Sequence, residues 1–169
     1  MDEERPVAAN MIRPAGEVAL DDVDRAIVRI LAADARTPNS TIARRVGVAP
    51  STCLLRVRRL QETGVVRGFH ADLGPEALGR PLQALVSVRL QSHARAALGS
   101  FAERLATLPG VLNVFFLAGA NDFLVHVAST SPEDLREFVV RNLNAAREVA
   151  STETSLVFEH VPGRGLQPD

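Results

Sequence analysis

The chain has 169 residues, of which 46% are hydrophobic, and a formal net charge of −1. This composition is typical of one or two globular domains and excludes a chain that is disordered throughout. No apolar run reaches the eighteen or so residues that a membrane span needs, so we expect no membrane segment. The acidic start MDEERPVAAN is unlike a secretory signal, and the chain has a single cysteine. These features predict a cytoplasmic protein without disulfides.

The charges are unevenly distributed along the chain. All nineteen basic side chains are arginines, and the segment 36–72 holds seven of them against two acidic residues. From residue 73 onward there are eight arginines and ten acidic residues. A basic segment in an otherwise mildly acidic chain is typical of a protein in which only one part touches nucleic acid.

Three helices are predicted in the first half of the chain. An aspartate at position 21 or 22 can cap the first, in which apolar residues recur at helical spacing. A second helix is expected over about 40–46, ended by Gly47, and a third over about 51–63. The run VVRGFHADL then predicts a small β-hairpin. Two helices separated by a four-residue turn and followed by a hairpin are the order of a winged helix-turn-helix domain.

The second half of the chain is predicted to be strand, helix and strand, twice over. PLQALVSVRL alternates apolar and polar residues and predicts a first strand, followed by a helix around Phe101. VLNVFFL and FLVHVA predict two strands joined by the turn AGAND. The run SPED begins a second helix with a serine cap and a proline, and TETSLVFEHV is the last strand. This order predicts a βαββαβ domain of ferredoxin-like type, and so an α+β protein.

The sheet face without helices is expected to be half apolar, because Leu85 and Val157 both belong to it. A second copy of the chain explains such a face better than water does. The stretch GPEALGRP, rich in proline and glycine, is the expected linker. The predicted division of the chain is therefore a flexible tail at 1–19, a winged helix-turn-helix domain at 20–73, a linker at 74–81, a ferredoxin-like domain at 82–161 and a tail at 162–169.

The third helix carries the residues that we expect to contact DNA. A helix of this kind enters the major groove with its N-terminal residues, so Ser51, Thr52 and Arg56 are candidates for reading bases. Leu55 projects from the exposed side, where it can touch a thymine methyl group. The other arginines placed in this surface are Arg44 and Arg45, on the preceding helix, and Arg58, Arg59 and Arg67, which favour phosphate contacts. The alternative is an ordinary solvated helix face.

No other cluster points to chemistry. Cys53 shares a helix face with Val57 and Leu60, so we interpret it as a small buried residue rather than a redox switch. The four histidines lack metal-ligand spacing, and there is no G-x-S-x-G motif or phosphate-binding glycine loop. We expect no metal, no cofactor and no enzyme activity.

The turn GAND, from Gly119 to Asp122, is a candidate for binding a small molecule. Glycine allows close approach of a ligand to the backbone, and Asp122 offers a carboxylate to an ammonium group. Thr152 and Thr154 offer hydroxyl groups on the last strand. A polar hairpin turn without a ligand is the alternative.

Together these motifs resemble the bacterial and archaeal Lrp/AsnC (feast/famine) transcription regulators. The resemblance covers roughly residues 20–161 and rests on LDDVDRAIVRIL, on PSTC with the arginine-rich helix after it, on LPGVLNVFFLAGANDFLVHVAS and on TETSLVFEHV. It implies dimers formed through the sheets of the C-terminal domains, higher oligomers such as tetramers or octamers, and an amino-acid effector bound between those domains. Carried onto this chain, the implied effector residues are Gly119, Ala120, Asn121, Asp122, Thr152 and Thr154.

The chain departs from that family pattern at two places. Leu55 stands where many members carry another arginine, and Asn121 and Phe123 replace the tyrosines of a G-x-Y-D-Y turn. The departures predict a different base preference and either a different effector or none. The sequence thus predicts a DNA-binding regulator, at least dimeric, tuned by an amino-acid-like effector. Its alternatives are an architectural DNA-binding protein without effector response and an amino-acid-sensing subunit of a metabolic enzyme.

Overall fold

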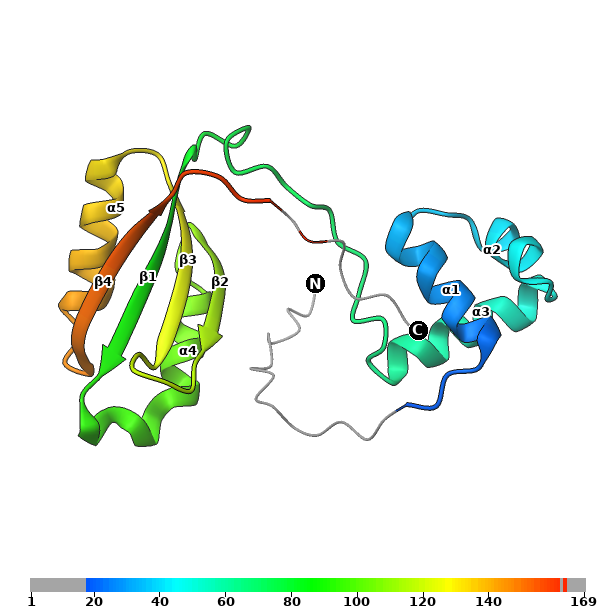
Figure 1. Ribbon diagram of the computed structural model, residues 1–169, viewed down its shortest axis with the longest axis horizontal. Coiled ribbons are helices and arrows are strands. Elements are labelled where there is room, and N and C mark those ends of the chain that lie inside the picture. Colours follow the sequence, from blue (N-terminus) through cyan, green and yellow to red (C-terminus); the bar gives the residue numbers. More distant parts are fainter. Residues whose placement is uncertain (1–17, 162, 164–169) are drawn as a thin grey trace, which may run out of the picture. The chain divides into compact units, whose positions relative to one another are not determined.

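The computed structural model describes residues 18–161 and residue 163 (Figure 1). Most of both predicted tails therefore lies outside the described residues. The described chain forms two compact units, and the boundary between them in the sequence falls between Asp72 and Leu73. The first unit carries three helices, and the second carries a four-stranded sheet with its own helices.

The first unit consists of α1 (Asp22–Ala33), α2 (Asn39–Val46) and α3 (Pro50–Glu62). Asp21 caps α1 in a capping box, in which it and Asp24 each accept a hydrogen bond from the other's backbone N–H. Gly47 ends α2 with φ 73°, a left-handed conformation that glycine adopts without steric cost. The three predicted helices are confirmed. Their buried core consists of Ile27, Leu31, Ile42, Ala43, Cys53 and Leu60.

The predicted β-hairpin after the third helix is wrong. The chain turns directly after α3, where the backbone N–H of Val66 donates to the carbonyl of Leu60 over 2.9 Å. Val65 and Val66 are neighbours in sequence, yet both pack against the helical core, which an alternating strand would not allow. Residues 67–74 have no regular secondary structure. The helix-turn-helix is therefore present without a wing formed by this segment.

The second unit has the predicted βαββαβ order. Its elements are β1 (Leu82–Leu90), the 3-10 helix η1 (Ser92–Ala97), α4 (Leu98–Ala106), β2 (Val111–Phe116), β3 (Phe123–Ser129), α5 (Pro132–Phe138), the π-helical segment η2 (Val139–Asn144) and β4 (Val149–Val157). The strands are antiparallel in the order β2-β3-β1-β4, which is a ferredoxin-like sheet. Ser131 caps α5 by accepting a hydrogen bond from the backbone of Asp134. The last strand begins and ends earlier than the run TETSLVFEHV predicts.

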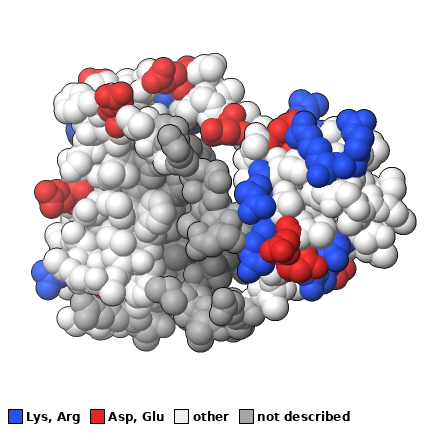
Figure 2. Space-filling view, turned by 45° about the vertical axis from the view of Figure 1, so that its right-hand side comes forward, with Lys and Arg blue, Asp and Glu red and all other residues white. Residues whose placement is uncertain are grey.

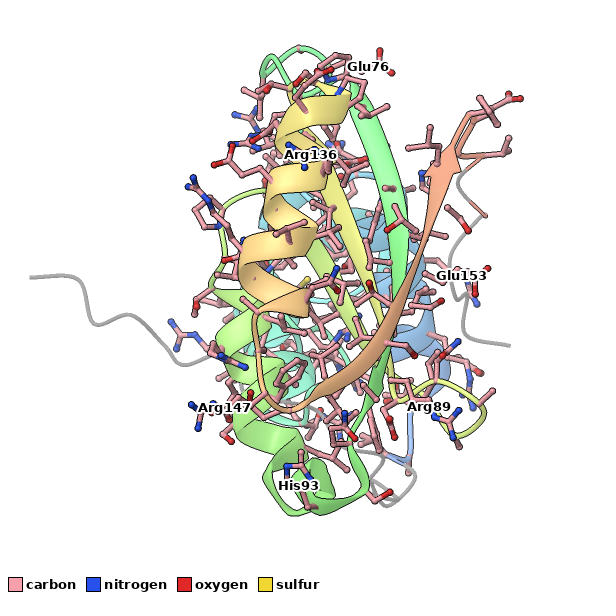
Figure 3. The ribbon with its side chains drawn as sticks, turned by 90° about the vertical axis from the view of Figure 1, so that its left-hand side faces the viewer. Glu76, Arg89, His93, Arg136, Arg147 and Glu153 are labelled. Atoms are coloured by element: carbon pink, nitrogen blue, oxygen red, sulfur yellow. The ribbon has the colours of Figure 1, made fainter. Side chains whose placement is uncertain are left out.

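Both α4 and α5 cover the same face of the sheet (Figures 1 and 3). Alternate residues of β1 and β3 meet Phe101 and Leu105 of α4 and Leu135 of α5 in one buried core. The other face of the sheet carries no helix of this unit. On that face Leu85 stands opposite His126 of β3 on one side and Ser155 of β4 on the other, as the predicted alternation requires.

Candidate nucleic-acid interface and effector site

The outer face of α3 presents an exposed stripe of three residues. Ser51, Leu55 and Arg58 follow one another at spacings of four and three, opposite the buried Cys53 and Leu60. All three are exposed, and 64% of the surface of Leu55 is accessible. This stripe, called the outer face below, is the side of α3 turned away from the helical core.

Leu54 is a further exposed residue at the start of α3 that the sequence pattern does not single out. It is 42% exposed and adjoins Leu55, so two large apolar side chains stand beside each other in water. Apolar contact with thymine methyl groups is one way in which a helix in the major groove reads A·T pairs. Thr52, predicted to read bases, is also exposed.

Arg56 and Arg59 point instead toward α1. The Nη1 of Arg56 donates to Oδ2 of Asp21 at 2.6 Å and to Oδ1 of Asp24 at 2.9 Å. The Nη2 of Arg59 donates to the second carboxylate oxygen of Asp24. The side chain of Asp24 is fully buried, whereas those of Arg56 and Arg59 are 28% and 48% exposed. Any contact of these two arginines with DNA therefore competes with ion pairs inside the protein.

Hydrogen bonds in this network also shift the pKa values of Asp21 and Arg56. The backbone N–H of Asp24, followed by the guanidinium of Arg56, holds the pKa of Asp21 below its ordinary value. Hydrogen bonds to Asp21 and then Asp24 raise the pKa of Arg56. Both shifts favour the charged forms of Asp21 and Arg56.

The remaining predicted cations of this unit are exposed. Arg44 and Arg45 lie in the last turn of α2, Arg58 lies on the outer face, and Arg67 lies in the segment after α3. None of these four arginines takes part in an ion pair among the described residues. Figure 2 shows arginine side chains gathered on the surface of this unit. Their charges are available to a polyanion.

Asn39 joins the beginnings of the two helices of the helix-turn-helix. Its Nδ2 donates to the carbonyl of Pro50 over 2.8 Å, from the first residue of α2 to the first residue of α3. The pattern of the sequence gives no sign of this contact, because it spans the whole of α2 and the turn. Asn39 therefore helps to set where the N-terminus of α3 stands.

In the second unit, Asp122 is buried rather than open to a ligand. Its side chain accepts a hydrogen bond from the backbone of Leu90 over 2.7 Å, and its own backbone N–H donates to Val88 over 2.9 Å. Gly119 and Ala120 are exposed and Asn121 is half-buried. Asp122 thus fastens the turn to the end of β1, and the exposed part of the turn is the stretch before it.

The predicted threonines lie away from that turn. Thr152 pairs with Val88 across one edge of β1, and Phe123, which follows the turn, pairs with Val88 across the other. One strand therefore separates Thr152 from the turn. The hydroxyl of Thr152 donates to Oδ1 of Asn144 over 2.8 Å. Within one chain, the turn and the threonines do not form a single pocket.

Thr154 does line a cavity of about 320 Å³ between α5, η2 and β4. The other lining residues are mainly apolar: Pro132, Leu135, Arg136, Val139, Val140 and Asn144. In the described part of the chain, no group of three or more metal-ligating side chains is assembled. No helix among the described residues is long and apolar enough to cross a membrane.

Two family models match the chain. The AsnC-type helix-turn-helix domain matches residues 20–61, and the Lrp/AsnC ligand binding domain matches residues 83–165. The chain is 58% identical to the transcriptional regulator AldR of Mycolicibacterium smegmatis, over 88% of this chain and 86% of that protein. It is 38% identical to the leucine-responsive regulatory protein of Rhizobium meliloti, over 85% of this chain and 92% of that protein.

Solved structures of transcriptional regulators are similar to this chain as well. The crystal structure of MtbAldR is 51% identical and superimposes with a TM-score of 0.72, covering 85% of this chain and 98% of that one. A transcriptional regulator of Neisseria meningitidis in complex with L-Met is 29% identical, with a TM-score of 0.76. That match covers 86% of this chain and 94% of the other.

Proposed function

The chain belongs to the Lrp/AsnC family of DNA-binding transcription regulators, and we propose that it reads DNA through the outer face of α3 under the control of an amino-acid effector. The observation that carries the first part is the exposed stripe of Ser51, Leu55 and Arg58. It lies on the second helix of a helix-turn-helix, in the only strongly basic stretch of the sequence.

The DNA contacts are divided by chemistry. Ser51 and Thr52 at the N-terminus of α3 offer hydroxyl groups to base edges, and Leu55 with its neighbour Leu54 offers apolar contact to thymine methyl groups. Arg58 on α3, with Arg44, Arg45 and Arg67 outside it, neutralises phosphates.

We propose that residues 20–73 form the DNA-binding domain and that residues 82–161 form the effector domain. Because its partner is chromosomal DNA, we assign the protein to the cytoplasm.

The base-reading role is tested by selecting duplexes from a random-sequence pool with the full chain and with a Leu55→Ser variant. Loss of the thymine contact predicts weaker preference for A·T at one or more positions of the selected motif. Leu78→Ser is the matched control, because Leu78 is also 64% exposed but lies in the turn before β1. An unchanged motif with Leu55→Ser would contradict the assignment.

The second part of the proposal is an amino-acid effector. It is supported by the match to a ligand-binding domain and by the L-Met complex of a related regulator. The cavity beside Thr154 is of a size usual for small ligands. Because the exposed turn Gly119–Asn121 lies apart from the threonines, we propose that one copy supplies the turn and another supplies Thr152 and Thr154.

Equilibrium dialysis of the full chain against each of the twenty amino acids tests the effector. One or a few amino acids should bind, and Thr154→Val should weaken that binding. Thr107→Val is the control, since Thr107 is exposed just after the end of α4 and its hydroxyl donates to the nearby carbonyl of Arg104. If no amino acid binds, the chain is better described as an architectural DNA-binding protein without effector response.

The helix-free sheet face is the proposed dimer interface, and we propose that dimers assemble further into tetramers or octamers. Leu85 and Leu124 lie on this face half-buried, and Phe115 is 49% exposed. Arg89 and Glu153, which Figure 3 shows on the side of the sheet away from α4 and α5, carry opposite charges on neighbouring strands. A two-fold interface can bring each of these charges opposite its counterpart in a second copy.

A further inference from the structure

We propose that Asp24 is a positioning residue for DNA recognition: it holds Arg56 and Arg59 against α1 and thereby sets which face of α3 meets DNA. This inference rests on the proposed DNA-binding role of α3. It gives α1, which carries Asp24, a role in DNA recognition through its contacts with α3. It also removes Arg56 from the residues expected to read bases and Arg59 from those expected to contact phosphates.

The geometry of the carboxylate carries the argument. Each oxygen of Asp24 accepts a hydrogen bond from a different arginine of α3, and one of them also accepts from the backbone of Asp21 at 3.3 Å. The side chain is completely buried, where an unpaired carboxylate would be strongly unfavourable. The two guanidinium groups therefore compensate the cost of burying this carboxylate.

The positions of Arg56 and Arg59 show that their contact with Asp24 fixes the rotation of α3 about its own axis. Arg56 and Arg59 are three residues apart, so they leave α3 on one flank, about a quarter-turn from the outer face. Apolar contacts, such as those of Cys53 and Leu60 with the core, restrict rotation of a helix only through shape. Charge-assisted hydrogen bonds are directional, so two of them on one buried carboxylate fix the rotation of α3 about its axis.

The ion pairs also determine which charges DNA can use. Asp21 and Asp24 balance Arg56 and Arg59, which leaves four of the six arginines predicted to meet DNA exposed and outside these ion pairs. Six arginines at phosphates would give a log-log salt slope of about −5 per chain, whereas four give about −4. The neighbours Arg58 and Arg59 separate the two cases, because they have the same chemistry and only Arg59 is paired with Asp24.

The test measures salt slopes of DNA binding by the full chain, using the duplex selected above and a scrambled duplex. Arg58→Ala should make the slope shallower by about 1 per chain. Arg59→Ala should change it by less than half as much. Asp24→Asn should release arginines to phosphates, steepening the slope and reducing the preference for the selected duplex. Asp22→Asn is the matched control, because Asp22 is fully exposed and contacts neither arginine.

Each outcome decides the proposal. Equal changes with Arg58→Ala and Arg59→Ala would overturn the positioning role while leaving the DNA-binding function intact, and this pair does not depend on the folding of Asp24→Asn. A folded Asp24→Asn variant with unchanged slope and unchanged preference would also overturn it. If neither arginine variant changes the slope, the proposed DNA face is wrong, and this inference falls with it.

Discussion

The carboxylate of Asp122 accepts a hydrogen bond from the backbone N–H of Leu90, over 2.7 Å, at the buried end of β1. The backbone N–H of Asp122 donates in turn to the carbonyl of Val88. Asp122, the residue of the turn best suited to bind a ligand's ammonium group, therefore holds the β2–β3 turn against the end of the central strand β1. An effector that approaches the turn meets Gly119, Ala120 and Asn121 first.

Asp122→Ala should destabilise the protein, because it leaves the buried N–H of Leu90 without an acceptor. A buried unsatisfied donor costs about 1–3 kcal/mol, which should lower the free energy of unfolding measured in urea by circular dichroism. Glu159→Ala, which removes an exposed carboxylate outside the sheet, should leave it unchanged. Equal unfolding curves for both variants would show that the hydrogen bond of Asp122 contributes nothing to stability.

Leu85→Arg should separate the proposed dimer. The substitution puts a charge in the middle of the helix-free face, where a second copy would have to bury it. Light scattering after size-exclusion chromatography should show a smaller species than the wild type, with an unchanged circular dichroism spectrum. Leu78→Arg, an equally apolar position in the turn before β1, should keep the wild-type mass. A full-sized oligomer of Leu85→Arg would place the interface elsewhere.

Acid should lower the stability of the fold through His126, which lies on the helix-free face of the sheet beside Leu85. Its Nε2 lies 2.9 Å from Oε1 of Gln83, and its Nδ1 lies 3.4 Å from Asn113. Burial, and then the charge of His160, lower the pKa of His126 below its ordinary 6.5. The unfolded chain consequently binds more protons than the folded chain as the pH falls through 6.5, so stability declines in that range.

Melting temperatures between pH 7.5 and pH 5.5 test this titration. The wild type should lose more stability over that range than His126→Asn, which has no proton to bind. His93→Asn is the control, because His93 is exposed on η1 (Figure 3). The account of His126 is wrong if its variant and the wild type respond to pH alike.

Cys53 should behave as a structural residue rather than a redox switch. It is completely buried in the helical core, and burial raises the pKa of its thiol. The thiol should therefore react with a disulfide reagent only in urea, at concentrations where the chain unfolds. Rapid reaction of the native protein, together with loss of DNA binding, would revive the redox interpretation.

Much of the fold follows from local patterns. The caps at Asp21 and Ser131, the left-handed Gly47 and the alternation of β1 are all signals within a few residues, and the structure contains each of them. The hairpin prediction is wrong because Val65 and Val66, whose residue type favours a strand, both pack against the nearby helical core. A short isolated hairpin has too little to stabilise it against that burial.

The site is harder to predict, because its contacts join distant parts of the chain. Arg56 and Asp24 are 32 residues apart, so no spacing along α3 distinguishes a paired arginine from a DNA-facing one. One local signal did exist: Asp24 lies on the apolar side of α1 with Ile27 and Leu31, where a charge needs a partner of opposite charge. The separation of Thr152 from the turn depends on strand order, which places β1 between them.

The most direct test of the whole account is a fluorescence-anisotropy titration of DNA with the full chain. The probes are the DNA upstream of the protein's own gene and a scrambled control, at two salt concentrations, with and without the twenty amino acids. We predict tighter binding to the upstream DNA, weakened by salt and shifted by the amino acids. Binding that ignores the amino acids would contradict the effector, and no binding even at low salt would contradict the role of α3.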